Sequence, residues 1–314
     1  MAMSSGGHLI NTPEPTSLPE GDVEAARIEG ESGSPTREIL RRTFHKKSAV
    51  IGLIIVVLVI LSQLIGPYVR PHDPYKLNLA ADAIYNAPPS GQHWLGTDDL
   101  GRDILSRLLV GGRISIAIAF AATAISLIVG VIVGGLSGFM RGWTDSILSM
   151  ITNWFLSFPF FLLALSIVAV RGSGAGSVML ALGLTGWAPF ARLLRGQVLG
   201  TRETEYVEAA KASGAGGYRI MMKHVLPNSM APVLVLASLS IGANITGEAA
   251  LSFVGVGVPP PSITWGQMAG EGQAYLTLNP IEVMAPSMMI AITLIAITLV
   301  GNALRDAADP KLKD

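Results

Sequence analysis

The sequence has no cysteine, little charge and no excess of charge of either sign. Without cysteine the chain cannot form disulfides, thiolate metal sites or a cysteine nucleophile, and its redox compartment stays open. Only 14% of its 314 residues are charged, against about 25% in an ordinary globular domain, and 50% are hydrophobic. The formal net charge is zero, so nothing points to a nucleic-acid partner. These proportions are typical of an integral membrane protein.

Several catalytic signatures are missing as well. No G-x4-G-K-[ST] phosphate loop occurs, so we expect that this chain is not an enzyme, binds no cofactor itself and does not hydrolyse ATP alone. No G-x-S-x-G nucleophile elbow is present. The histidines are scattered over the tail and loops without an H-E-x-x-H motif, which argues against a metal site. They are His8, His45, His72, His93 and His224.

The two ends of the chain are polar. Residues 1–34 are rich in Pro, Gly, Ser and Glu, so we expect a disordered cytoplasmic tail, with a docking arm as the alternative. They contain no apolar core of a cleavable signal peptide. Residues 35–48 are basic, and by the positive-inside rule they hold the N-terminus in the cytoplasm. Residues 305–314 again carry Arg and Lys, which predicts a cytoplasmic C-terminus.

Six apolar runs lie between residues 49 and 304, each long enough to cross a hydrocarbon core of about 30 Å. We therefore expect an all-α fold, a polytopic membrane protein with six transmembrane helices. An even number of spans places both termini and the polar loop 203–228 on the cytoplasmic side. The expected spans are about 49–69, 114–136, 146–170, 178–198, 232–254 and 284–304.

Two of these spans contain residues that shape a membrane helix. Gly130, Gly134 and Gly138 recur at intervals of four, which forms a small-residue ridge for close helix packing. Pro159 lies inside the third span, where the loss of a backbone hydrogen bond predicts a kink.

The polar loop 203–228 reads as a pair of short helices. Glu205–Lys211 suits a helix, since Glu, Ala and Lys are good helix formers, and Gly214 follows as a breaker. A second short helix over residues 218–225 should run up to Pro227. One face of the first helix is small and mildly apolar, and it can lie close against another protein. That face carries Tyr206, Ala209, Ala210 and Ser213.

The same loop carries a recognisable motif. Glu208-Ala209-Ala210, three residues, Gly214, nine residues and then His224-Val225-Leu226-Pro227 resemble the EAA loop of ABC-importer permeases, with His224 in place of its isoleucine. In that family the loop is a cytoplasmic helix pair that fits a groove on the ATP-hydrolysing subunit. An amphipathic loop with a chance EAA is the alternative. The resemblance implies an ATPase-coupling role for Glu205, Glu208, Ala209, Ala210, Gly214, Leu226 and Pro227.

Two further segments resemble permeases of dipeptide, oligopeptide and nickel importers: LGTDDLGRDILS at residues 95–106 and GEAALSFVGVGVPPPSITWG at residues 247–266. Thr97 or Asp98 can cap a helix with an apolar stripe. Two interpretations of residues 95–106 stay open, an amphipathic helix on the outer membrane surface and a surface that helps to receive a binding protein. The motif residues are Gly96, Thr97, Asp98, Gly101, Arg102, Asp103, Trp265 and Gly266.

This resemblance covers the chain from about Arg37 to its end. It implies the fold of a type I ABC-importer permease in a bacterial-type cytoplasmic membrane. It further implies a second homologous permease, two ATP-binding subunits that use ATP and Mg, an extracytoplasmic binding protein and a peptide substrate. Transport would proceed by alternating access between inward-open and outward-open states.

Polar residues in and beside the spans have two interpretations each. An ionisable residue within a span is a functional candidate, so Asn244, Thr246 and Glu248 either line the translocation path or lie at the interface between two permease subunits. Three arginines near the coupling loop are expected to anchor in the cytoplasmic headgroups, with a contact to the ATPase as the alternative. They are Arg192, Arg195 and Arg202.

Other functions remain open. The same architecture could import nickel, glutathione or haem instead of peptides. An ion-driven secondary transporter should show internal repeats and broken helices with midplane charges, and no such repeat is found. A membrane enzyme would need a polar cluster shared between spans, to which only Asn244, Thr246 and Glu248 could contribute.

Overall fold

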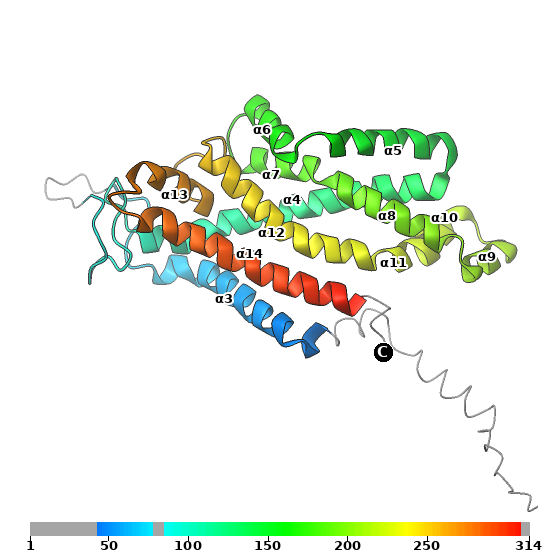
Figure 1. Ribbon diagram of the computed structural model, residues 1–314, viewed down its shortest axis with the longest axis horizontal. Helices are drawn as coiled ribbons and strands as arrows, with labels where there is room; N and C mark the ends of the chain where they lie inside the picture. The colour runs from blue at the N-terminus through cyan, green and yellow to red at the C-terminus, as the bar shows by residue number, and fades with distance from the viewer. Residues whose placement is uncertain (1–42, 78–84, 309–314) are drawn as a thin grey trace, which may run out of the picture.

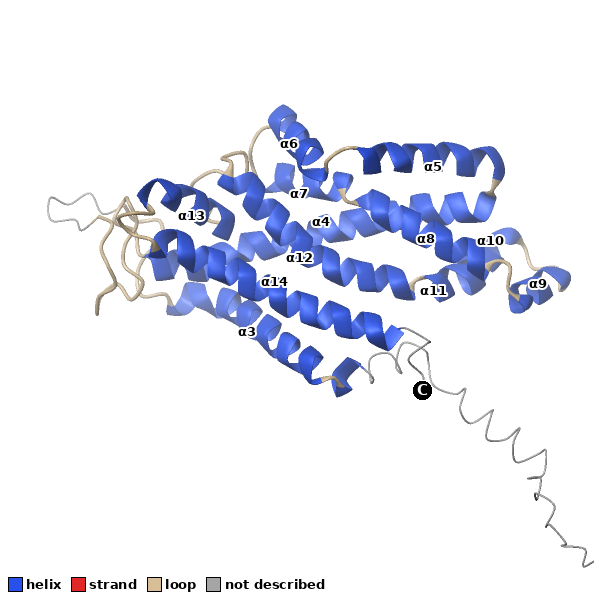
Figure 2. Ribbon diagram, in the orientation of Figure 1, coloured by secondary structure: helices blue, strands red, loops and turns tan. Residues whose placement is uncertain are grey.

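The computed structural model describes residues 43–77 and 85–308, as an elongated bundle of helices (Figure 1). The expected tail 1–34, part of the basic segment and the last residues 309–314 lie outside the described residues. Within the described residues the regular structure is helical, and β-type pairing is confined to one isolated bridge (Figure 2). The all-α class is therefore confirmed.

The helices differ widely in length, from four residues to 37. In chain order they are α3 (Lys47–Val69), α4 (Ile104–Met140), α5 (Gly142–Ser157), α6 (Phe160–Arg171), α7 (Ala175–Thr185), α8 (Trp187–Thr201), α9 (Glu205–Ala212), α10 (Gly217–Ile220), the π-helix η1 (Met221–Val225), α11 (Leu226–Ser229), α12 (Ala231–Phe253), α13 (Trp265–Gly272), the 3-10 turn η2 (Gln273–Tyr275) and α14 (Ile281–Ala308).

The long helices lie along the length of the bundle and leave two different ends (Figure 1). Residues 70–77, 85–103 and 254–280 gather at one end, which we call the loop end. Helices α9 and α10 project at the opposite end, which we call the α9 end. Helix α4 packs against α3, α7, α8 and α12, and α14 packs against α3, α12 and α13. The core is therefore built around α4.

Helix α4 is longer than the sequence predicts. It begins at Ile104 instead of about 114, and its cap is Asp103, whose carboxylate accepts a 2.8 Å hydrogen bond from Ser106 N. The predicted caps Thr97 and Asp98 are wrong. Gly111 and Gly112 separate the amphipathic stripe from the apolar run in the sequence, but both are buried inside α4, where a Cβ would meet Ile263 or Trp265. The stripe and the run therefore form one helix of 37 residues, about 55 Å long at about 1.5 Å per residue.

The expected glycine ridge faces α8. A Cβ at Gly138 would lie 2.9 Å from the Cβ of Val198, and side chains at Gly130 and Gly134 would meet Phe190 and the backbone of Ala191. The absence of side chains on this face of α4 therefore lets the two helices come close together.

The expected third span, 146–170, is not one kinked helix. Helices α5 and α6 meet at an angle of 91° around Phe158 and Pro159. Phe158 is extended, with ψ 141°, because the ring of a following proline disfavours the helical conformation, and Pro159 caps α6. Among the described residues, five helices are long and apolar enough to cross a membrane, or six if this bent pair forms one span.

The remaining spans differ from the expected bounds by a few residues. The fourth, expected at 178–198, is divided at Gly186 into α7 and α8, which together make a continuous apolar stretch of 27 residues. The first, fifth and last correspond to α3, α12 and α14, each of which begins one to three residues earlier than predicted.

The packing of α4 on α8 leads to a first prediction. Gly134→Leu should lower the free energy of unfolding by about 1–3 kcal/mol, because overpacking a tight contact forces the helices apart. Thermal unfolding in detergent measures the change. Gly196→Leu is the matched control, since a Cβ at Gly196 of α8 meets nothing within 4 Å. Equal stability of the two variants would contradict the prediction.

Candidate functional site

Helix α9 is the most prominent projection of the described chain (Figure 1). It follows α8 after a three-residue turn and begins at Glu205. Glu205 and Glu208 lie in its first turn and Lys211 in its last, so each charge opposes the helix dipole at its own end. A short isolated helix is marginal in water, so α9 needs these charges and its contacts with the bundle.

A single large apolar side chain anchors α9 to the bundle. Val207 is fully buried and belongs to a cluster with Val198 of α8, Ile220 of α10 and Val225 of η1. The sequence analysis did not select Val207. The sequence feature that could have identified it is its β-branched side chain, the one such side chain in α9.

Gly214 ends α9 in a left-handed conformation, with φ +80°. Its N–H donates to Lys211 O at 3.0 Å, and the N–H of Ala215 donates to Ala210 O at 3.1 Å. These two bonds form a Schellman motif, which satisfies carbonyls at the helix end and needs a residue that tolerates positive φ. The glycine of the motif therefore sets the direction of the turn from α9 to α10.

The second half of the loop does not stop before Pro227, as the sequence predicts. Helix α10, the π-helix η1 and α11 follow one another without a break, and Pro227 lies at the start of α11, where a missing N–H breaks little. Asn228 of α11 donates from Nδ2 to the Tyr206 hydroxyl at 3.2 Å. This bond joins the last part of the loop to α9.

The side chains of the expected coupling residues remain accessible. Glu205, Glu208, Ala209, Gly214 and Pro227 are exposed, and Ala210 and Leu226 are half-buried. The polar and small residues of the motif thus face away from the bundle, and the apolar Val207 faces it. This arrangement leaves a surface of small side chains and carboxylates free to meet another protein.

Arg202 ties the start of the loop to α4. Its guanidinium donates from one nitrogen to Gly138 O at 3.2 Å and to Phe139 O at 2.7 Å, the carbonyls at the C-terminal end of α4. A cation at this end of a helix is favourable. Burial lowers the pKa of Arg202, and the nearby Arg141 lowers it further. Arg202 therefore joins the start of the loop to the end of the central helix.

The other two arginines also have partners within the chain. Arg195 makes two bonds to the Asp145 carboxylate, at 2.6 and 2.8 Å, and Arg192 donates to Asn153 Oδ1 at 2.8 Å. They connect α8 to α5. Both interpretations of these arginines, headgroup anchors and an ATPase contact, stay predictions.

At the loop end the first motif forms a buried ionic cluster. Asp98 is fully buried and accepts from Arg102 Nε at 2.7 Å and from an Arg107 nitrogen at 2.5 Å. Both arginines also reach Glu271, at 3.1 and 2.7 Å. Burial raises the pKa of Asp99, and the negative charge of Asp98 raises it further. The cluster joins the motif to α13.

The other motif residues are buried as well. Trp265 donates from Nε1 to Leu108 O at 3.1 Å, and a Cβ at Gly266 would meet the backbone of Ala249. The surface-helix interpretation of residues 95–106 is wrong, because α4 begins only at Ile104 and Thr97, Asp98 and Asp103 are buried. The interpretation of this segment as part of a receiving surface stays a prediction. The buried motif residues are Gly96, Thr97, Asp98, Gly101, Asp103, Trp265 and Gly266, while Arg102 is half-buried.

The polar residues of α12 divide into two groups. Glu248 is fully buried and accepts from Ser115 Oγ and Ser252 Oγ, both at 2.8 Å, and Asn244 donates to Thr123 Oγ1 at 2.9 Å. In this conformation Asn244 and Glu248 join α12 to α4 inside the chain, and their expected role at a path or a subunit interface stays a prediction. Thr246 is exposed and stays a candidate for either role.

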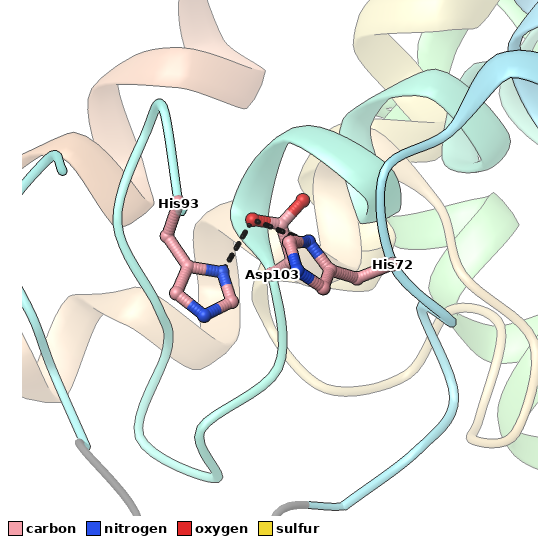
Figure 3. Close-up of side chains that lie close together, drawn as sticks. All are labelled: His72, His93 and Asp103. Carbon is pink, nitrogen blue, oxygen red and sulfur yellow. Dashed lines mark hydrogen bonds and ion pairs between the residues drawn. The ribbon is translucent and has the colours of Figure 1, made fainter. Parts of the chain in front are cut away.

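Two histidines that are distant in sequence meet at the loop end. His72 and His93 lie on either side of Asp103, with ring centroids 4.5 Å apart (Figure 3). The Nδ1 atoms lie 3.7 and 2.8 Å from Asp103 Oδ1. The description of the histidines as scattered is wrong for this pair.

The structure is a bundle of apolar helices with an exposed helix pair at one end. Comparison with known proteins agrees with this geometry. Residues 126–314 match the model of the binding-protein-dependent transport system inner membrane component. The chain belongs to this family. Residues 34–89 match the N-terminal TM domain of oligopeptide transport permease C. The expected membership among permeases of peptide importers is thus confirmed.

Relatives of the permease match it over nearly their full lengths. It is 41% identical to the oligopeptide transport system permease protein OppC of Bacillus subtilis (strain 168), over 96% of this chain and 97% of that protein. It is 37% identical to the dipeptide transport system permease protein DppC of the same strain, over 94% and 91%. The glutathione transport system permease protein GsiD of Pectobacterium atrosepticum is 38% identical, over 89% and 92%.

A solved structure shares the fold of the permease. An inward-facing MetNI methionine ABC transporter matches with a TM-score of 0.53 and 23% identity, over 65% of this chain and 96% of that one. The type I importer fold expected from the sequence is confirmed.

The Schellman motif leads to a second prediction. Gly214→Ala should destabilise the end of α9 by about 1–2 kcal/mol, because a residue with a Cβ is strained at positive φ. Amide hydrogen exchange of α9 should then be about tenfold faster or more. Gly216→Ala is the control, since Gly216 has φ −64° and open space around a Cβ. Unchanged exchange in the Gly214 variant would contradict the assignment.

The buried cluster leads to a third prediction. Asp98→Asn should lower the free energy of unfolding by about 3 kcal/mol or more, because two arginines lose a charged partner inside the protein. Denaturation in detergent measures the loss. Asp73→Asn, which alters an exposed carboxylate of the same loop end, should change stability little. A loss no larger than that of the control would show that Asp98 is not the organising charge.

Proposed function

We propose that this permease is the membrane subunit of an ATP-driven importer that carries dipeptides or oligopeptides inward. The observation that carries the proposal is the 41% identity to an oligopeptide permease over almost the whole of both chains. The dipeptide relative supports the same substrate class. A glutathione relative favours a second candidate, glutathione, which is itself a small peptide.

The proposed complex has four kinds of protein component. This permease pairs with a second, homologous permease, and two ATP-binding subunits with ATP and Mg dock on the α9 end. An extracytoplasmic binding protein delivers the peptide at the loop end. The lipid bilayer surrounds the apolar helices, many of whose large side chains are exposed on this single chain.

Charge supports an orientation with α9 and both termini in the cytoplasm of a bacterial-type cell. Lys46, Lys47, Arg202 and Arg305 lie at the helix ends on that side. The positive-inside rule disfavours basic residues at the loop end in this orientation. Arg102 and Arg107 weigh little against the orientation, because they are paired with buried or part-buried carboxylates.

The geometry supports a path for the ATPase motion. An ATPase that closes on ATP would move α9 through its exposed face. Val207 and the Schellman turn would pass that motion to α8 and α10, and Arg202 would pass it to α4. ATP can shift the permease between inward-open and outward-open states only by its differential affinity for the two.

Reconstitution tests the substrate class. The assembled complex in liposomes, with ATP inside and the binding protein outside, should accumulate labelled dipeptides or oligopeptides and should not do so without ATP. Uptake of glutathione but of no other peptide would select the second candidate. Peptide uptake that continues without the ATP-binding subunits would contradict the proposal.

The coupling surface leads to a fourth prediction. Glu208→Ala should leave the complex assembled and weaken ATP-driven uptake by about tenfold, because a hydrogen bond to a charged group contributes about 1.5–3 kcal/mol. Asp306→Ala is the control, since Asp306 is an exposed carboxylate near the end of α14 that pairs with Lys46. Uptake at the wild-type rate in the Glu208 variant would exclude this carboxylate as the polar anchor of α9.

A further inference from the structure

Three potential metal ligands converge at the loop end. His72 follows α3, His93 lies in the loop before α4, and Asp103 caps α4 (Figure 3). One donor atom of each side chain lies within 4.8 Å of the other two. The fold thus brings three separate segments to one point.

Local hydrogen bonds hold the three groups in place. The N–H of His72 donates to Ser106 Oγ at 3.1 Å, and the N–H of His93 donates to Ser90 Oγ at 3.0 Å. Asp103 uses Oδ2 to accept from Ser106 N, which leaves Oδ1 directed at both imidazoles. The donor atoms are therefore positioned by backbone contacts that a bound ion would not need to disrupt.

The distances suit a small divalent ion. Zinc binds imidazole nitrogen at about 2.0–2.1 Å and carboxylate oxygen at about 2.0–2.2 Å, so two donors of a tetrahedral site lie roughly 3.4 Å apart. The observed distances of 2.8 and 3.7 Å from Asp103 Oδ1 lie on either side of that value. Modest rotations of two side chains would bring both nitrogens to bonding distance.

Access and charge also suit such an ion. The Asp103 side chain is fully buried, whereas those of His72 and His93 are 40% and 24% exposed. An ion can therefore enter from solvent, bind a carboxylate in a low-dielectric setting and keep water as a further ligand. Two imidazoles and one carboxylate favour zinc, nickel or copper over magnesium or calcium.

We propose that His72, His93 and Asp103 form a binding site for a divalent transition metal, with zinc as the reference ion. The bound ion would join the segment after α3, the loop at residues 85–97 and the start of α4. It would stabilise the loop end, and this role does not depend on which substrate the permease carries.

Zinc titration of the purified permease tests the site. The full chain, purified through a tag without histidine and freed of metal by a chelator, is titrated with Zn²⁺ by calorimetry at neutral pH. We expect one equivalent to bind and the melting temperature to rise. Co²⁺, used as a spectroscopic probe, should show the absorption of a low-coordinate site with nitrogen and oxygen ligands.

Three variants and a control locate the ion. Removal of an outer-shell partner weakens metal binding by about 10- to 100-fold. His72→Ala and His93→Ala should each weaken Zn²⁺ binding by more than this. Asp103→Asn should also weaken it, while asparagine keeps the helix cap. His45→Ala changes an exposed histidine at the other end of the molecule and should leave binding unchanged.

Two results would overturn the proposal. One is Zn²⁺ binding that is equal in the wild type and in the His72→Ala/His93→Ala double variant. The other is the absence of a saturable equivalent in a wild type that is folded by circular dichroism. Either result would leave the cluster as a hydrogen-bonded contact between loops.

Discussion

Where Gly130 and Gly134 lie, α4 has no side chains, so the backbone of α8 approaches that of α4 directly. Everything at the α9 end is built on this contact. Helix α8 continues into the coupling loop, and Arg202 then returns to the last carbonyls of α4. The two helices are thus in close contact and joined again at their ends, which supports the proposal that a displacement of the loop is passed to α4.

The two ends of the bundle differ in how firmly they are held. At the loop end, Asp98, Arg102, Arg107 and Glu271 form a cluster whose charges are largely withdrawn from water, and removal of one partner is costly. At the α9 end, one buried valine and a glycine turn hold a short helix with a largely exposed surface. Local stability of this uneven kind is expected where one element must move against a fixed frame.

Much of this architecture could be read from the sequence. Apolar runs locate the long helices, and the EAA spacing locates α9 and its glycine turn, because both are local patterns. The start of α4, the 91° bend at Pro159 and the burial of Glu248 could not be read in this way. The start of α4 and the bend rest on a cap at Asp103 and on Pro159, which hydropathy does not weigh. The burial of Glu248 depends on which helices become neighbours, and hydropathy carries no information on that.

The loop end shows the same limit more clearly. The motif around Asp98 could be recognised, but Glu271, which pairs with Arg102 and Arg107, lies 169 and 164 positions after them. The meeting of His72 with His93 likewise follows only from the path of two loops. Charged residues in a polar loop look solvated in a sequence. In this structure they are buried and make contacts within the chain. Because a sequence does not show that burial, a surface role was expected for them.

The docking of α9 on an ATP-binding subunit is the central claim, and site-specific cross-linking measures it most directly. The chain has no cysteine, so a single cysteine at the exposed Ala209 gives an unambiguous attachment point. In the assembled complex a short thiol cross-linker should join this cysteine to an ATP-binding subunit and block uptake, whereas a cysteine at the exposed Trp94 of the loop end should not. Cross-linking of both positions, or of neither, would contradict the account.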